Sequence, residues 1–168
     1  MGISIVKRKL SQQESVVLAA ETKKSPHIGY IAPHIWKNFN HVFVATNGQE
    51  LLGVCVVVPL RNYMKIGPII VLSEHQGKHV GSRLLDRVAK AYRNHSLYIG
   101  SSNSRVQHVV ERLGFSQVSY WQLPLQIKLY LLSYLWQRGN IDYILDSLTK
   151  IARHRRGKYH FYLRHPLP

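Results

Sequence analysis

A short basic stretch from Ser73 to Leu85 carries residue types that hold phosphate groups. Its sequence, SEHQGKHVGSRLL, includes Gly77 and Gly81, which let the backbone approach a ligand closely, and Lys78, which adds positive charge. The stretch joins the branched apolar run YMKIGPIIVL to the amphipathic run GSRLLDRVAKAYRN, so we expect it to connect a strand to the start of a helix. Unpaired backbone N–H groups at a helix start attract anions. The stretch therefore predicts a phosphate or pyrophosphate site.

The spacing of these glycines excludes two common phosphate motifs. Neither the GxxxxGK[ST] pattern of nucleotide-binding loops nor the GxGxxG pattern of dinucleotide-binding folds is present. On local chemistry alone, a glycine-containing turn that holds no ligand remains an alternative.

Two histidines and one cysteine offer other chemistry. On a helix, the spacing of His75 and His79 would let them share a metal ion, but both precede the predicted helix and nothing suitable completes a ligand set. We therefore expect surface histidines and no metal. Cys55 is the only cysteine, and its neighbours in GVCVVV favour a small buried side chain over a nucleophile. A single cysteine excludes an internal disulfide and fits a reducing, cytoplasmic setting.

Apolar periodicity predicts strands and helices in mixed order within one domain, residues 1–168. Turn residues 47–50 predict a hairpin between two of the strands, and Ser11 is suited to cap the first helix. We expect strands at 3–9, 41–46, 51–60, 63–72, 97–102, 116–123 and 158–165. We expect helices at 12–24, 33–40, 81–94 and 103–115, and a helical hairpin inserted at about 124–155.

The first half of that hairpin carries a stripe of large apolar residues at helical spacing. Leu125, Leu129, Leu132, Leu135 and Trp136 form it. We expect this stripe to pack in the core; a dimer face or a contact with a membrane surface is the alternative. The surrounding apolar tract is interrupted and short for a bilayer span, so we expect no integral membrane segment.

The charge is strongly positive. Among 168 residues, 23 Lys and Arg stand against 8 Asp and Glu, which gives a formal net charge of +15. Such a balance favours a polyanionic partner, because each neutralised phosphate releases counterions. A generally basic surface that keeps the protein soluble is the alternative.

Two motifs together resemble the GNAT superfamily of N-acetyltransferases. The stretch QGKHVGSRLL is similar to that family's pyrophosphate loop, and NSRVQHVVERLGF, residues 103–115, is similar to a second motif in which Asn opens a helix that ends in Leu-Gly-Phe. The resemblance covers roughly residues 1–122 and the last predicted strand. It implies the α/β (α+β) GNAT fold, with a mixed, mostly antiparallel twisted sheet of six to seven strands flanked by helices. The helical hairpin before the last strand lies outside the resemblance.

The resemblance also implies a cofactor, acetyl-CoA or another acyl-CoA, and residues that bind it. The pantetheine arm would pair with the strand end formed by Ile69, Ile70 and Val71, beside a neighbouring strand that is splayed away. Asn103 would lie near the same arm. The pyrophosphate would accept hydrogen bonds from the loop formed by Gln76, Gly77, Lys78, His79, Val80, Gly81 and Ser82.

Two residues depart from the family's pattern. His79 stands where the family has the first glycine of a pair, so its side chain would crowd the loop or donate to phosphate. Val110 stands where the family often has the tyrosine that protonates the departing thiolate. The nearest substitutes in sequence are Tyr98, Ser101 and Ser102, and Tyr63 or Tyr120 could reach in from adjacent strands. We predict Tyr98 or Ser102 as the general acid. Ordinary packing of a strand tyrosine, or a serine that satisfies backbone groups, is the alternative.

A basic cluster near the C-terminus bears on the acceptor. Arg153, Arg155, Arg156 and Lys158 are followed by aromatic residues, a mixture suited to RNA or single-stranded nucleic acid. We therefore predict acetyl transfer to an amine carried by nucleic acid, such as an aminoacyl-tRNA or a modified base in tRNA or DNA. A protein or small-molecule amine is the alternative within enzymes, and a non-catalytic module that binds CoA or RNA is the alternative outside them. A homodimer is compatible with each of these functions.

Overall fold

Seven strands form one sheet in the computed structural model, which describes residues 2–137 and 159–166. The sheet order is β1-β2-β3-β4-β5-β7-β6, and every neighbouring pair is antiparallel except β4 and β5. This confirms the predicted mixed, mostly antiparallel sheet. The strands are β1 (Ser4–Lys7), β2 (Val42–Asn47), β3 (Glu50–Leu60), β4 (Tyr63–Val71), β5 (Ser96–Ser101), β6 (Ser116–Val118) and β7 (His160–Arg164).

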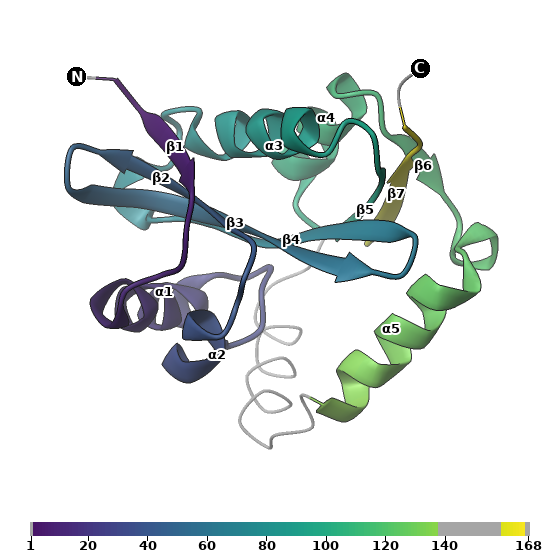
Figure 1. Ribbon diagram of the computed structural model, residues 1–168, viewed down its shortest axis with the longest axis horizontal. Helices are drawn as coiled ribbons and strands as arrows, with labels where there is room; N and C mark the ends of the chain where they lie inside the picture. The colour runs from purple at the N-terminus through teal and green to yellow at the C-terminus, as the bar shows by residue number, and fades with distance from the viewer. Residues whose placement is uncertain (1, 138–158, 167–168) are drawn as a thin grey trace.

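Helices cover both faces of the sheet (Figure 1). On one face lie α3 (Val80–Ala91) and α4 (Ser104–Arg112). On the other lie α1 (Gln12–Lys24), α2 (Pro33–Lys37) and α5 (Leu125–Gln137). Two apolar layers follow from this arrangement. Leu84 and Val88 of α3 are buried against one face, and Trp36 of α2 is buried against the other.

The start of α1 follows from its sequence. Ser11 caps the helix, because its hydroxyl accepts a hydrogen bond from the Glu14 N–H at 3.1 Å. The Glu14 carboxylate in turn accepts from the Ser11 N–H at 2.8 Å. This reciprocal pair satisfies two backbone donors that a helix start leaves free. The predicted cap is confirmed.

The strand predicted at 116–123 is much shorter than expected. β6 ends at Val118, and a short 3₁₀ turn follows at Tyr120–Gln122. The Gln122 side chain accepts a hydrogen bond from the Ser119 N–H at 2.8 Å. Ser119 thus starts a capped turn, and that local bonding replaces further pairing in the sheet.

The prediction that the apolar stripe of α5 packs in the core is wrong for Leu125, Leu129 and Leu132. These side chains are 71%, 56% and 54% exposed. The helix instead packs through Ile127, which is fully buried, and Leu131. Periodicity indicated which leucines share one face of the helix. Because α5 carries apolar residues on most sides, that spacing did not tell which face meets the sheet, and a different face does. The second helix of the predicted hairpin lies outside the described residues.

No helix in the described part of the chain is long and apolar enough to cross a bilayer.

Candidate active site

The sheet opens between β4 and β5. These parallel strands pair only at their first residues, and the last pair joins Lys65 to Tyr98. Beyond it, β4 stays paired with β3, and β5 stays paired with β7. The two strands therefore turn unpaired backbone edges toward each other. An extended chain can add to such an edge through main-chain hydrogen bonds.

A bulge in β4 lies where the strands separate. One residue of β3, Val56, faces two residues of β4, Gly67 and Pro68. Gly67 has a φ of 113°, which residues with a side chain rarely adopt. A bulge bends its strand and increases the local twist. The irregularity in β4 thus coincides with the opening of the sheet.

A groove of about 1050 Å³ fills this opening. Its walls include the second halves of β4 and β5, the loop after β4, the start of α4, and the segment between α1 and α2. The end of α1, the start of α3, Tyr130 and Leu131 of α5, and Tyr159 before β7 also line it. The groove is also lined by the residues that were predicted to lie at the pantetheine arm, Ile69, Ile70, Val71 and Asn103. This volume matches the upper end of small-ligand sites.

The loop after β4 presents free backbone donors at one end of the groove. Gly77 has a φ of 82° and His79 a φ of 60°, and α3 begins directly afterwards at Val80. Within the described residues, no backbone N–H from Gly77 to Ser82 donates a hydrogen bond. These donors suit an anion at the start of α3. Most of the predicted loop lines the groove, namely Gln76, Gly77, His79, Val80, Gly81 and Ser82.

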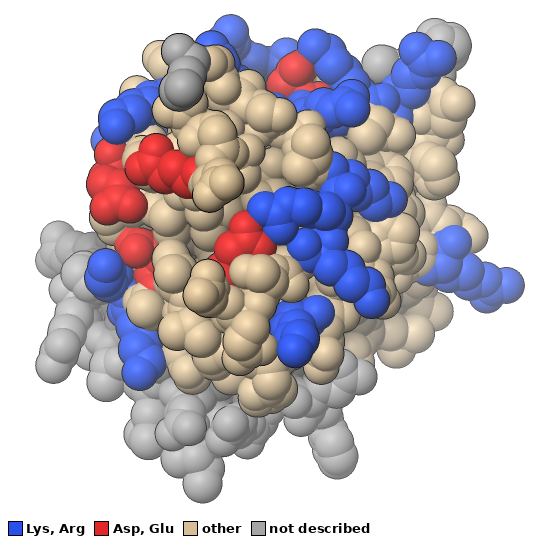
Figure 2. All heavy atoms as spheres, turned by 60° about the vertical axis from the view of Figure 1, so that its left-hand side comes forward, with Lys and Arg blue, Asp and Glu red and all other residues tan. Residues whose placement is uncertain are grey.

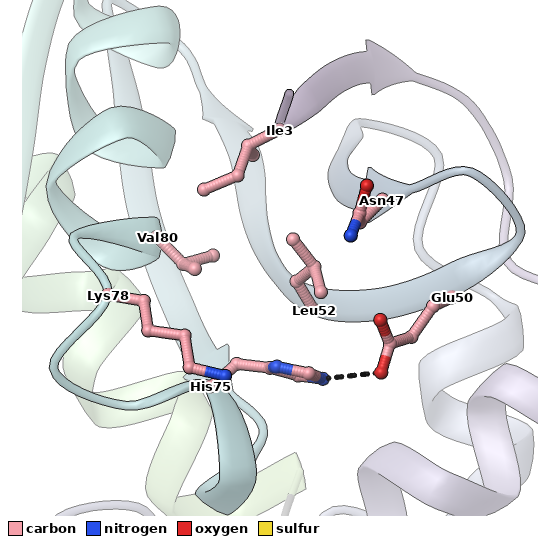
Figure 3. A pocket seen from close by; sticks show the side chains of 7 residues that line it. All are labelled: Ile3, Asn47, Glu50, Leu52, His75, Lys78 and Val80. Atoms are coloured by element: carbon pink, nitrogen blue, oxygen red, sulfur yellow. Dashed lines mark ion pairs between the residues drawn. The ribbon is translucent and has the colours of Figure 1, made fainter. Parts of the chain in front are cut away.

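His75 anchors this loop from behind, and the prediction of a surface histidine is wrong for it. Its side chain is only 8% exposed, because the loop folds it back against the β2–β3 hairpin. Its Nε2 lies 3.2 Å from Glu50 and 3.6 Å from Glu74, an ion pair when the imidazole is protonated (Figure 3). His79, by contrast, is exposed as predicted.

Lys78 points away from the groove. It lines a small cavity of about 130 Å³ on the far side of the loop, together with His75 and Glu50 (Figure 3). Its backbone N–H is then the one group of this residue that can donate to an anion in the groove. The predicted role of the Lys78 side chain at the pyrophosphate therefore has no support in this geometry.

A second tether joins α1 to the same loop. The hydroxyl of Ser73 donates to the carboxylate of Glu21, which also lies 3.3 Å from the Lys24 ammonium. The Glu21 side chain is 10% exposed and lines the groove. Among the described lining residues Glu21 is the one acid, and both of its oxygens are engaged.

Tyr98 places a phenol at the point where β4 and β5 part. The residue is 1% exposed and lines the groove, and its hydroxyl has no hydrogen-bond partner among the described residues. Burial raises the pKa of the phenol, and the nearby Tyr159 and Tyr130 raise it further. Tyr98 is therefore a protonated donor at neutral pH, and within the described part of the chain no atom accepts its proton.

Ser102 is arranged differently. It is buried and is absent from the described lining of the groove. Its hydroxyl lies 3.2 Å from Nδ1 of His27, which belongs to the segment between α1 and α2. This contact links that segment to the end of β5. Of the two predicted general acids, only Tyr98 faces the groove.

A family model describing the acetyltransferase (GNAT) family matches residues 12–115. The chain belongs to the GNAT family. The matched range contains the opening between β4 and β5, the loop before α3, and α4. A search of curated proteins returned no match.

Several solved structures share the fold at low sequence identity. N-acetylglutamate synthase from Neisseria gonorrhoeae, complexed with coenzyme A and N-acetyl-glutamate, aligns over 100% of this chain with a TM-score of 0.69 and 16% identity. This chain spans only 36% of that protein. A GNAT acetyltransferase from Staphylococcus aureus Mu50 aligns over 97% of this chain and 98% of its own, with a TM-score of 0.61 and 16% identity. The ribosomal-protein-S18-alanine N-acetyltransferase from Escherichia coli covers 69% of this chain and 80% of its own, with a TM-score of 0.56 and 14% identity.

The two departures from the GNAT pattern have structural consequences. His79 adopts the left-handed backbone that a glycine would take at the same place, so the loop keeps its course despite the side chain. Val110 is fully buried in the core between α3, α4 and the sheet. A proton donor is thus missing from that position, and among the described residues Tyr98 is the buried phenol that lines this GNAT groove.

Glu21, His27 and Lys65 are among the groove residues that were not predicted from the sequence. Glu21 sits on a helix whose sequence shows no clear apolar face, so its orientation was not predictable. His27 lies in an irregular segment, and the only local signal for it is that loops often carry function. Lys65 lies in a strand and reaches the groove only because β4 and β5 part beside it. The predicted substrate residues Arg153, Arg155, Arg156 and Lys158 lie outside the described residues.

Proposed function

We propose that this GNAT protein transfers an acetyl group from acetyl-CoA to an amine, and that the acceptor amine is carried by a nucleic acid. The observation that carries the first part is the groove between β4 and β5, which ends at a loop with free backbone donors. Coenzyme A is present in the N-acetylglutamate synthase structure that shares this fold, which supports the same cofactor here.

In this proposal acetyl-CoA would lie along the groove. The backbone of Ile69 and Ile70 pairs with β3 on one side, which leaves the other side of β4 for the amides of pantetheine. The N–H groups from Gly77 to Ser82 would hold the pyrophosphate. Asn103 caps α4 through its side-chain oxygen, which accepts from the Arg105 N–H at 3.0 Å. Its side-chain NH2 is left to donate to the pantetheine arm.

Tyr98 supplies the proton that the reaction needs. The amine attacks the thioester carbonyl, the carbon–sulfur bond breaks, and the leaving thiolate accepts the Tyr98 proton. The proton that the amine nitrogen loses then restores the phenol. The Tyr98 hydroxyl is buried and has no partner among the described residues, so its proton is available to the thiolate. Ser102 is oriented toward His27 and is the weaker candidate.

The groove offers little to deprotonate the acceptor. Its one described acid, Glu21, is occupied by Ser73 and Lys24. An amine of low pKa, such as the α-amine of an ester, requires little help from a base. An aminoacyl-tRNA carries such an amine, and its phosphates suit the net charge of +15. Figure 2 shows one face of the molecule, on which Lys and Arg side chains cover more area than Asp and Glu.

A protein or free amino-acid acceptor is the second candidate. It is favoured by two structures that share this fold, whose names specify N-acetylglutamate and the alanine of a ribosomal protein. Labelled acetyl-CoA incubated with aminoacyl-tRNA, free amino acids and a peptide panel separates the candidates. We expect label in the aminoacyl-tRNA fraction. Label in peptides or amino acids alone would overturn the nucleic-acid acceptor and leave the acetyltransferase intact.

The basic cluster provides a second test of the acceptor. Replacing Arg153, Arg155 and Arg156 with Ala should weaken binding to tRNA. It should also flatten the dependence of log K on log salt by about one unit for each phosphate that the variant no longer neutralises. An unchanged slope would show that these side chains do not bind phosphates.

A further inference from the structure

Three tyrosines and a lysine gather at the inner end of the groove, where β4 and β5 part. Tyr98 and Lys65 are opposite each other in the last pair of the two strands. The phenols of Tyr130 and Tyr159 lie close enough to Tyr98 to raise its pKa. All four side chains line the groove. We propose that the rings of Tyr130 and Tyr159 form an acceptor subsite that stacks a nucleobase, with Lys65 placed to meet the adjoining phosphate.

This subsite deepens the proposed function and rests on it. Tyr98 is the proton donor in that proposal, so the part that is new falls to Tyr130, Tyr159 and Lys65. Tyr130 and Tyr159 lie beyond residues 12–115, the range that matches the family. Parts of the chain outside the family's common region therefore build this wall of the groove. Such a wall is suited to select the acceptor, because the acceptor is what differs between members of one acetyltransferase family.

The position of Tyr159 depends on a glycine. A Cβ added to Gly100 would lie 2.5 Å from the Tyr159 hydroxyl oxygen and 2.9 Å from its Cζ, which is closer than real contacts allow. The ring also meets Phe161 edge to face, with 5.2 Å between centroids. Gly100 thus makes room for a ring that a second aromatic side chain orients. Tyr159 nevertheless stays 54% exposed, so ring surface remains for a ligand.

Lys65 brings a positive charge to the same wall. Its ammonium donates to the carbonyl of Gly67 at 2.9 Å and lies 5.5 Å from the centre of the Tyr130 ring. Lysine is a common ligand of phosphate. Together, a cation and π-faces match a nucleotide, because every nucleobase stacks on aromatic rings while its phosphate attracts a cation.

The charge of the lining disfavours a cationic acceptor. Lys24, Lys65 and Arg105 are set against the single acid Glu21 among the described lining residues. A lysine side chain or a polyamine would meet net positive charge here, whereas a nucleotide would be attracted. An uncharged peptide is neither attracted nor repelled by this charge balance, so it serves as a competitor in the test.

The experiment compares variants of Tyr159 that separate the ring from its bulk. Tyr159→Phe keeps the ring and Tyr159→Leu removes it, and the half-exposed position lets both variants fold. The probes are a short single-stranded RNA that ends in adenosine and the same RNA with an abasic 3′ residue. We expect Tyr159→Leu to weaken binding of the adenosine-ended RNA by roughly 5-fold to 100-fold, the effect of removing one stacking partner. Tyr159→Phe should bind this RNA like the wild type, and the abasic RNA should bind equally to all three proteins.

A second variant tests the placement of the ring. Gly100→Ala should displace Tyr159 and reproduce the effect of Tyr159→Leu on RNA binding. Equal binding by Tyr159→Leu and Tyr159→Phe, equal affinity of the wild type for the two RNAs, or stronger competition by a peptide would overturn the subsite.

Acetyl-CoA titration of each variant keeps the two proposals distinct. Variants that bind acetyl-CoA but do not discriminate the base leave the acetyltransferase standing, whereas a wild type that binds no acetyl-CoA removes both.

Discussion

Tyr98 is the residue on which the proposed chemistry depends most. Its hydroxyl is buried, lines the groove, and has no partner among the described residues. We predict that Tyr98→Phe lowers kcat by about 10²-fold to 10⁴-fold, the usual contribution of a positioned acid, and leaves the affinity for acetyl-CoA unchanged.

The matched control for this change is Tyr162→Phe. Tyr162 is equally buried, but its hydroxyl donates to Glu111 at 2.9 Å and it is absent from the described groove lining. That variant should keep its kcat. Steady-state kinetics with acetyl-CoA measure kcat for both variants. A wild-type kcat for Tyr98→Phe would show that another group donates the proton to the thiolate.

His79 adopts a left-handed backbone conformation that glycine adopts more readily than other residues. Its φ of 60° is left-handed, a conformation that costs L-residues about 1–2 kcal/mol. His79→Gly removes that cost but adds flexibility to the unfolded chain, so we expect the free energy of unfolding to change by less than about 1 kcal/mol. His79→Val, which is β-branched, should lower it by about 1–3 kcal/mol. Urea denaturation measures both, and equal stability of the two variants would contradict the backbone assignment.

Cys55 tests whether the core between the sheet and α3 is closed. The side chain is fully buried, and burial raises the pKa of its thiol to about 12. We therefore expect iodoacetamide to modify the folded protein very slowly at pH 8 and to react readily after denaturation. The unfolded thiol loses its proton near pH 8.5, so this residue should also make the free energy of unfolding fall as pH rises above about 9. Rapid labelling of the folded protein, followed by mass spectrometry, would refute the buried position.

Among the elements, the loop before α3 is held in place by its neighbours. Ser73 ties it to α1 through the nearly buried carboxylate of Glu21. Ser73→Ala should lower the free energy of unfolding by about 1.5–3 kcal/mol, the range for a hydrogen bond to a charged group, and weaken acetyl-CoA binding because the loop loses an anchor.

Lys24→Ala serves as the comparison for that loop variant. The Lys24 side chain is 65% exposed, so its ion pair with Glu21 should contribute only about 0–1 kcal/mol. Thermal unfolding and calorimetry compare the two variants directly. If both cost the same and neither alters acetyl-CoA binding, Ser73 is not an anchor of the loop.

Element order was predictable where local signals agree. Ser11 marked the start of α1, and the change from a branched apolar run to a helical period marked the step from β4 to α3. The length of β6 was not predictable, because Ser119 and Gln122 form a local turn that competes with pairing. The packed face of α5 was not predictable either, since periodicity reveals spacing but not which neighbour a helix meets.

The site was predictable only as far as its backbone. The loop and the strand end at Ile69 to Val71 follow from local sequence and from the family resemblance. Glu21, His27 and Lys65 reach the groove through tertiary packing, which no local pattern encodes. Tyr98 was a candidate because of its residue type and its strand position. That its hydroxyl has no partner within the described part of the chain depends on the folded surroundings and could not be predicted.

At the scale of the whole molecule, the groove is built both by the region that matches the family and by residues beyond that region. Residues 12–115 match the family and hold the opening, the loop and Tyr98. Tyr130 and Tyr159 come from beyond that range and line the same groove. We therefore assign acetyl-CoA to the common region and acceptor choice to the additions and to the positive charge.

The central claim is that the groove between β4 and β5 binds acetyl-CoA with its pyrophosphate on the loop from Gly77 to Ser82. Calorimetric titration with acetyl-CoA, and with acetyl-pantetheine that lacks the pyrophosphate, tests it most directly. We predict one acetyl-CoA per chain and at least about tenfold weaker binding of acetyl-pantetheine, since that ligand cannot accept the charge-assisted hydrogen bonds of the loop. No heat with acetyl-CoA, or equal affinity for the two ligands, would contradict the account.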